Sequence, residues 1–203
     1  MTSVRPCVVI IGGVNGSGKS TFAQRAAGTD LLLGQVAINP DELSKQAMQD
    51  MPALNDPGAS LAGAEKAEKA VWRAIAEGRS VAVETVLSSD KFEPVLFAAR
   101  NREYRIRLIF VALPSVEYSL ERIADRVLKG GHDVPSDKVR SRWSKAHDNL
   151  VRFLALVDDV LVFSNIENSP ILVAQRIGGG GTLELRDSLA LPEVTRRLES
   201  GGR

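Results

Sequence analysis

The chain has 203 residues, of which 44% are hydrophobic and 25% charged, a composition typical of one ordinary globular domain. Its 26 Lys and Arg nearly balance 25 Asp and Glu, and this net charge of +1 argues against a protein that coats nucleic acid or anionic membranes. The single cysteine, Cys7, excludes an internal disulfide, and no apolar run approaches the roughly 20 residues that cross a bilayer. We therefore expect a soluble, cytoplasmic protein with a single domain over residues 1–198 and a frayed tail at 199–203.

The first half of the chain predicts strands that alternate with helices. The β-branched run at 8–11 has no polar alternation, which is typical of a strand covered on both faces. Strands are expected at 8–11, 35–39 and 80–85, and helices at 20–27, 41–51 and 64–77. Asp41 can cap the second of these helices. The stretch 51–63, which is rich in Pro and Gly, is expected to be mostly loop.

The second half continues the same alternation. Helices are expected at 90–101, at 116–128 with Ser115 as its cap, and at 136–156. Strands are expected at 105–113, 160–164, 171–177 and 182–186. Glycines 178–181 closely separate the last two strands, which predicts a C-terminal β-hairpin. Strands alternating with helices indicate an α/β fold with a mainly parallel sheet flanked by helices.

Residues 13–20 read GVNGSGKS and match the phosphate-binding pattern GxxxxGK[ST] in full. Glycines let successive backbone N–H groups face the phosphates, the lysine reaches the β- and γ-phosphates, and the last hydroxyl binds Mg²⁺. A buried-type strand precedes the motif and a helix follows it, as the mechanism requires. We predict a three-layer P-loop NTPase or kinase fold that uses ATP and Mg²⁺. The predicted cradle comprises Gly13, Asn15, Gly16, Ser17, Gly18, Lys19, Ser20 and Thr21, with Ser20 as the metal ligand.

Two carboxylates follow or end predicted strands. Asp41 comes just after the strand at 35–39, and Glu84 lies at the end of the strand at 80–85. Ligands of open α/β sheets bind beyond the carboxyl ends of the strands, so both side chains should face the crevice that holds Lys19. Asp41 could take the proton of an acceptor hydroxyl or merely cap its helix. Glu84 could serve the site, as the nearest equivalent of a Walker-B aspartate, or face solvent. Asp158 and Asp159 precede a strand and are expected at the opposite edge.

A basic segment follows at residues 122–152, with eight Lys or Arg and four Asp. Gly130 and Gly131 interrupt its helical pattern, so helix, hinge and helix could form a lid over phosphates. Arginine in a lid stabilises charge on a transferred phosphoryl group, although two solvated helix faces would give the same pattern. Both histidines of the chain, His132 and His147, lie here, and a structural role is favoured over acid–base chemistry.

Taken together, several segments resemble the zeta-toxin family of P-loop kinases in its short, single-domain form. They are GVNGSGKST at 13–21, NPD at 39–41, ETVLS at 84–88 and RVLKGGHDVP at 126–135. The resemblance implies a kinase that phosphorylates a sugar hydroxyl of UDP-N-acetylglucosamine with ATP and Mg²⁺, and in some members a small antitoxin as partner. It implies the following roles: Asp41 as the base, Lys19, Arg126 and Arg142 as further catalytic groups on the phosphates, and Glu84, Thr85 and His132 as substrate contacts.

The leading interpretation is therefore a kinase that transfers the γ-phosphoryl group of ATP to a small-molecule hydroxyl, for example that of a nucleotide sugar. The alternative is a P-loop ATPase switch or binding module coupled to a protein partner, which would need a residue that orients water. A kinase of nucleic-acid ends is disfavoured, because a polymer track needs a longer basic groove than one lid. Neither nucleic acid nor a membrane is expected as a partner.

Overall fold

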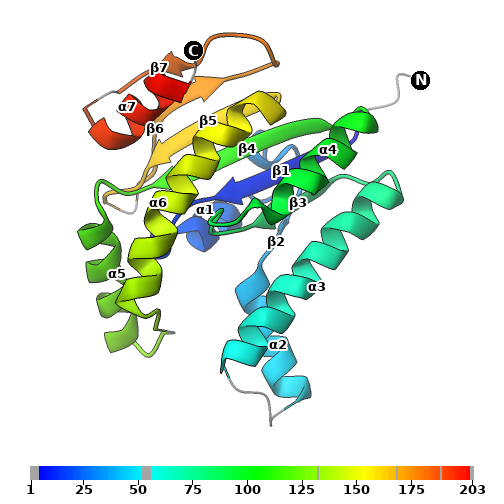
Figure 1. The fold of residues 1–203 in the computed structure, drawn as a ribbon. Helices are drawn as coiled ribbons and strands as arrows, with labels where there is room; N and C mark the ends of the chain where they lie inside the picture. Colours follow the sequence, from blue (N-terminus) through cyan, green and yellow to red (C-terminus); the bar gives the residue numbers. More distant parts are fainter. Residues whose placement is uncertain (1–4, 52–55, 132, 168, 188, 202–203) are drawn as a thin grey trace.

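The computed structural model describes residues 5–51, 56–131, 133–167, 169–187 and 189–201. The strands found in these residues are β1 (Cys7–Gly12), β2 (Ala37–Ile38), β3 (Val81–Glu84), β4 (Arg105–Ala112), β5 (Asp159–Ser164), β6 (Ile171–Arg176) and β7 (Glu184–Leu185). They form one sheet in the order β2-β3-β1-β4-β5-β6-β7 (Figure 1). β1 to β5 pair in parallel, whereas β6 and β7 pair antiparallel. The mainly parallel sheet and the C-terminal hairpin are thus confirmed.

Helices cover both faces of the sheet. They are α1 (Lys19–Ala26), α2 (Pro40–Asp50), α3 (Asp56–Ala76), α4 (Glu93–Asn101), α5 (Val116–Leu128), α6 (Ser136–Phe153) and α7 (Pro192–Gly201). Val8 and Ile10 of β1 pack on the side of α3, α4, α6 and α7, while Val9 and Ile11 pack on the side of α1. All four side chains are fully buried, because this strand is covered on both faces. The predicted three-layer α/β architecture is confirmed.

The stretch predicted as loop at 51–63 is wrong for residues 56–63, which form the first turns of α3. Residues 52–55 lie outside the described part of the chain. Gly63 lies inside the helix at a point where α2 packs directly against it. A Cβ atom there would overlap Ser44 and the carbonyl oxygen of Pro40, so only glycine fits. The glycine therefore marks a helix–helix contact and not a break in the helix.

The C-terminal segment contains a helix that was not predicted. α7 extends through residues 199–201, where a frayed tail was expected, and residues 202–203 lie outside the described ranges. Its apolar residues Val194 and Leu198, and Leu191 just before it, are buried against the main core. Tertiary packing of this apolar face orders the segment.

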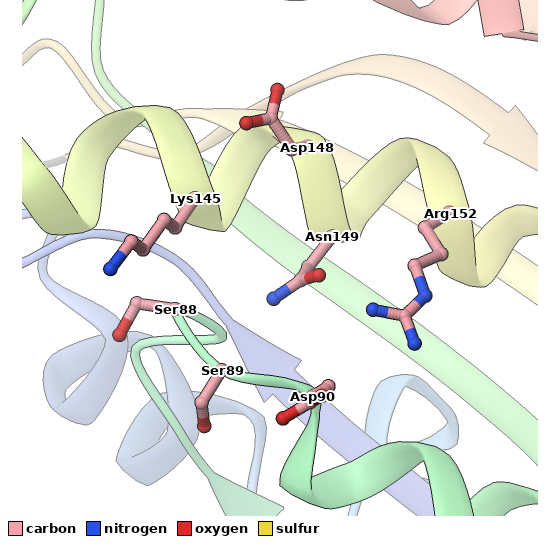
Figure 2. Close-up of a pocket in the computed structure, with 7 residues that line it drawn as sticks. All are labelled: Ser88, Ser89, Asp90, Lys145, Asp148, Asn149 and Arg152. Carbon is pink, nitrogen blue, oxygen red and sulfur yellow. The ribbon is translucent and has the colours of Figure 1, made fainter.

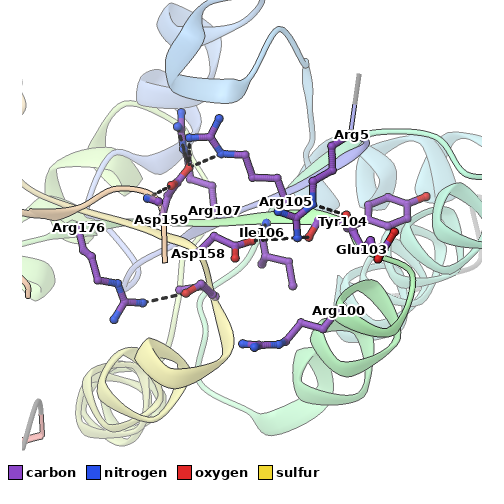
Figure 3. Close-up of polar contacts among 12 residues, drawn as sticks. Arg5, Arg100, Glu103, Tyr104, Arg105, Ile106, Arg107, Asp158, Asp159 and Arg176 are labelled. Carbon is purple, nitrogen blue, oxygen red and sulfur yellow. Dashed lines mark hydrogen bonds and ion pairs between the residues drawn. The ribbon is translucent and has the colours of Figure 1, made fainter. Parts of the chain in front are cut away.

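Asp159 begins β5 and so lies at the edge of the sheet opposite the P-loop, as expected. Figure 3 shows the polar contacts around it. Its carboxylate is fully buried and pairs with Arg105 and Arg107 at 2.9 and 2.8 Å, while the N–H of Gly178 donates to it at 2.9 Å. Burial by itself would raise the pKa of Asp159, but the Gly178 N–H and the two guanidinium groups hold it below the usual range. These contacts give Asp159 a structural role. None of the helices in the described ranges is long and apolar enough to cross a membrane.

Candidate active site

The P-loop connects β1 to α1 at the carboxyl edge of the parallel strands. Gly16 and Gly18 adopt left-handed backbone conformations, with φ of 77° and 83°. Gly18 also meets the rest of the protein, because a Cβ atom there would lie 2.5 Å from Nδ2 of Asn165. Only glycine combines this conformation with so close an approach. The loop thus has the backbone that the phosphate-binding pattern requires.

Lys19 points back into the loop, where its Nζ donates to the carbonyl oxygen of Val14 at 2.9 Å. Burial lowers the pKa of Lys19 from 10.5 to about 8. Nearby charges modulate this effect, the acidic groups raising the pKa and the basic groups lowering it. They belong to Glu84, Asp41, Arg126 and Arg142. Four residues from separate parts of the sequence are therefore brought into the electrostatic neighbourhood of the P-loop lysine.

Ser20 links the P-loop to β3. Its hydroxyl donates to Oε2 of Glu84 at 2.8 Å and accepts from Nδ2 of Asn39 at 3.3 Å. Glu84 is 5% exposed, and burial raises its pKa, opposed by the Ser20 hydrogen bond and the charge of Lys19. A hydroxyl and a carboxylate are hard oxygen ligands, which fit Mg²⁺ when phosphate and water oxygens complete its shell. Ser20 and Glu84 therefore form a pair of oxygen groups that could hold Mg²⁺ beside the P-loop.

Asp41 does not cap α2, so that prediction is wrong. The N-cap is Asn39, whose Oδ1 accepts from the backbone N–H of Asp41 at 2.9 Å, with Pro40 in the first helical position. The physical reason is that proline favours this first position, so the residue before it becomes the cap. The exposed Asp41 carboxylate accepts no hydrogen bond from the described residues and remains available for other chemistry.

The basic segment brings two arginines to the P-loop. Arg142 of α6 donates to Oδ1 of Asn15 at 3.4 Å. The N–H of Gly131 donates to the carbonyl oxygen of Arg126 at 2.9 Å, and a Cβ atom on Gly131 would meet the Arg126 side chain at 2.5 Å. The turn between α5 and α6 is therefore built closely around Arg126. His132, predicted as a substrate contact, lies outside the described residues.

The structure also places Thr21, Thr85 and His147, three residues considered from the sequence. Thr21 is exposed on the first turn of α1. Oγ1 of Thr85 accepts from the N–H of Leu87 at 3.2 Å and so shapes the turn after β3. His147 is buried with Nδ1 2.7 Å from the carbonyl oxygen of Trp143, and burial lowers its pKa. Its neutral, enclosed ring fits the structural role that was favoured for it.

Two residues that contact the P-loop were not singled out from the sequence. Nδ2 of Asn165 donates to the carbonyl oxygen of Ser17 at 2.7 Å, and the hydroxyl of Ser119 donates to the carbonyl oxygen of Asn15. Asn165 directly follows β5 at the carboxyl edge, a position that could have indicated it. Ser119 has no such signal, because only the packing of α5 against the loop brings it there.

A groove of about 360 Å³ runs between α6 and the turn that follows β3 (Figure 2). In that view Ser88, Ser89 and Asp90 face Lys145, Asn149 and Arg152 of α6. A second hollow of about 360 Å³ shares Ser88 and Lys145 with it and reaches Arg142. Arg142 also donates to Asn15 of the P-loop, so the second hollow lies next to the phosphate cradle.

The mainly parallel sheet, the helices on both of its faces and the phosphate-binding loop define the fold of a P-loop kinase. The chain belongs to the zeta toxin family, whose model, described as Zeta toxin, matches residues 1–172. An uncharacterised protein of Haemophilus influenzae is 30% identical over 131 residues, which make up 64% of this chain and 88% of that protein.

Solved structures share the fold at low sequence identity. The structure of AvrRxo1-ORF1:ORF2 with ATP has a TM-score of 0.70 at 18% identity and covers 95% of this chain. This chain spans only 64% of that protein's length. A structure of the PezAT chromosomal toxin–antitoxin system of Streptococcus pneumoniae has a TM-score of 0.63 at 17% identity. The match covers 99% of this chain and 87% of the chain in that structure. At this identity the likeness concerns the fold alone.

Proposed function

We propose that this protein is an ATP- and Mg²⁺-dependent kinase that transfers the γ-phosphoryl group to a hydroxyl of a small molecule. One observation carries the proposal above the others. Asn39 caps α2, which leaves the carboxylate of Asp41 uncommitted while its charge acts on Lys19. A carboxylate beside the phosphate cradle, with no structural duty, is suited to orient an acceptor hydroxyl and take its proton.

The other site residues supply charge and position. The P-loop amides and Lys19 bind the phosphates, and the helix dipole of α1 adds to their field. Ser20 and Glu84 would hold Mg²⁺, which when bound neutralises charge between the phosphates. Arg126 and Arg142 place positive charge at the transferred phosphoryl group, where charge rearranges in the transition state.

The acceptor site that we propose is the groove between α6 and the turn after β3. Its lining of hydroxyl, amide and charged side chains suits a polar molecule, and the second hollow, which shares Ser88 and Lys145 with it, reaches Arg142. The family resemblance suggests UDP-N-acetylglucosamine as the first acceptor to test, with Glu84 and Thr85 near the sugar. His132 is proposed as a further contact on the same basis.

We also propose a small antitoxin protein as a partner, because the family is that of zeta toxins and one similar structure is that of a toxin–antitoxin system. The proposal places the protein in the cytoplasm, where ATP is supplied. It includes neither nucleic acid nor a membrane as partner, since the net charge is only +1.

The test is Asp41→Asn, which keeps the side-chain size but removes the proton acceptor. Phosphoryl transfer to UDP-N-acetylglucosamine, or to an acceptor found with labelled ATP in a metabolite extract, should fall by ~10²- to 10⁴-fold. The affinity for ATP should stay almost unchanged. Asp50→Asn, at the far end of the same helix, is the matched control and should behave like wild type. Transfer that survives in Asp41→Asn contradicts the assignment of the base. ATP hydrolysis with no acceptor found would favour the switch.

A further inference from the structure

Two carbonyl groups of the P-loop are held from outside the loop. Asn165, just after β5, donates to the carbonyl oxygen of Ser17 at 2.7 Å, and Ser119 of α5 donates to that of Asn15. The donors are 3% and 0% exposed, so water does not compete for these bonds. Asn165 is itself anchored to the sheet, because its N–H donates to the carbonyl oxygen of Ala112 at 3.1 Å.

These bonds also determine where the next N–H groups point. In a trans peptide the C=O and N–H groups point in opposite directions, and the described residues contain no cis peptide. When Asn165 pulls the Ser17 carbonyl outward, the N–H of Gly18 must face the other way. Ser119 has the same effect on Gly16 through the carbonyl of Asn15. Neither N–H finds an acceptor among the described residues.

The two glycines make this alternation possible. Gly16 and Gly18 are left-handed, which lets alternate carbonyls turn out while the intervening amides turn in. Both glycines also lie close to the elements that hold the loop. A Cβ atom at Gly16 would lie 3.0 Å from the carbonyl oxygen of Ser119, and one at Gly18 would lie 2.5 Å from Nδ2 of Asn165. The loop is therefore pressed between α5 and the end of β5.

We propose that Asn165 and Ser119 are positioning residues that orient the amides of Gly18 and Gly16 toward the nucleotide phosphates. This inference rests on the proposed use of a nucleotide by the P-loop. The bonds hold the cradle in its binding geometry before the ligand arrives, so less order has to be imposed on binding. Ser119 lies in the helix that carries Arg126, so the same bond ties the lid to the cradle.

The experiment measures the binding of ATP with Mg²⁺, and of inorganic tripolyphosphate, by calorimetry at a temperature where every variant is folded. Asn165→Ala should weaken ATP binding roughly 10- to 100-fold, as expected when the Gly18 N–H loses its hydrogen bond to a charged phosphate group. Ser119→Ala should weaken it by a similar or smaller factor. Tripolyphosphate affinity should fall by the same factor as ATP affinity, because the affected contacts are to phosphate. Asn165→Asp should be worse than Asn165→Ala, since a carboxylate donates no hydrogen bond and repels phosphate.

Matched controls exist in the chain. Tyr104 is 1% exposed, and its hydroxyl donates to the carbonyl oxygen of Ile75 at 3.3 Å, far from the P-loop in the sequence and outside the candidate site. Ser164 is a buried serine beside Asn165. Tyr104→Phe should lower stability and Ser164→Ala, whose hydroxyl has no hydrogen-bond partner among the described residues, should change it little, and neither should change ATP affinity.

The outcomes separate this inference from the proposed function. If wild type binds ATP and both Asn165→Ala and Ser119→Ala bind it equally well, the inference is overturned and the kinase proposal stands. If Tyr104→Phe loses as much ATP affinity as Asn165→Ala, the effect is general destabilisation and the inference is again overturned. If wild-type protein binds neither ATP nor tripolyphosphate, the proposed function fails as well.

Discussion

Replacing Asp159 by asparagine tests whether the charge cluster opposite the P-loop serves stability alone. Oδ2 of Asp159 accepts from Nε and Nη2 of both Arg105 and Arg107, at 2.8–2.9 Å. The side chain of Arg107 is only 8% exposed, so the substitution leaves a buried positive charge without its counter-ion. Removing one partner of a buried ion pair costs about 3–5 kcal/mol. For a protein of this size, that lowers the melting temperature by roughly 6–20 °C.

Urea denaturation at pH 7, with thermal melting alongside it, measures the effect. Asp158→Asn is the control, because Asp158 is more exposed and lies 3.9 Å from its arginine, Arg5, so its loss should be smaller. Because the pKa of Asp159 is lowered by folding, its stabilisation is fully present above the usual aspartate pKa of about 4 and is lost as the pH falls through the lowered value. The difference between wild type and variant should therefore shrink in acid. Unchanged stability at pH 7, or a loss of ATP affinity in the folded variant, would refute the reasoning.

Four further substitutions test the site and the helix contact that supports it. Lys19→Ala should abolish ATP binding in calorimetry while the protein stays folded, and unchanged affinity and turnover would contradict the cradle. Arg126→Ala and Arg142→Ala should each lower turnover by ~10³- to 10⁵-fold with little change in melting temperature. A large loss of stability with full activity per folded molecule would instead indicate a structural role. Gly63→Ala should push α2 away from α3, lower stability by ~1–3 kcal/mol and reduce transfer more than ATP affinity, because the displaced turn carries Asp41. If Gly63→Ala has the transfer kinetics and melting temperature of the wild type, the α2–α3 contact accommodates the extra methyl group and the prediction is wrong.

The elements of the sheet were predictable from short windows of sequence. β1 is a continuous apolar run, as is β4 from Leu108 to Ala112, and burial on both faces requires that pattern. The Ser115 cap of α5 is local as well, since its side chain accepts from the N–H of Tyr118 three residues on. The P-loop pattern also encodes its own backbone, because glycine permits the left-handed turns. In each case the deciding interactions lie within a few residues of one another.

Tertiary structure decided the features that depend on distant partners. Gly63, which the sequence suggests as a helix breaker, lies inside α3. The first turn of α2 occupies the space that a larger side chain at this position would need. Asp41 is free of capping and acts on Lys19 only because β2 pairs beside β3, which places α2 near the P-loop. Asn165 and Ser17 are 148 residues apart in the chain, yet 2.7 Å separates donor from acceptor. No local pattern encodes such a contact, because it exists only after the parallel strands have aligned their carboxyl ends along one edge of the sheet.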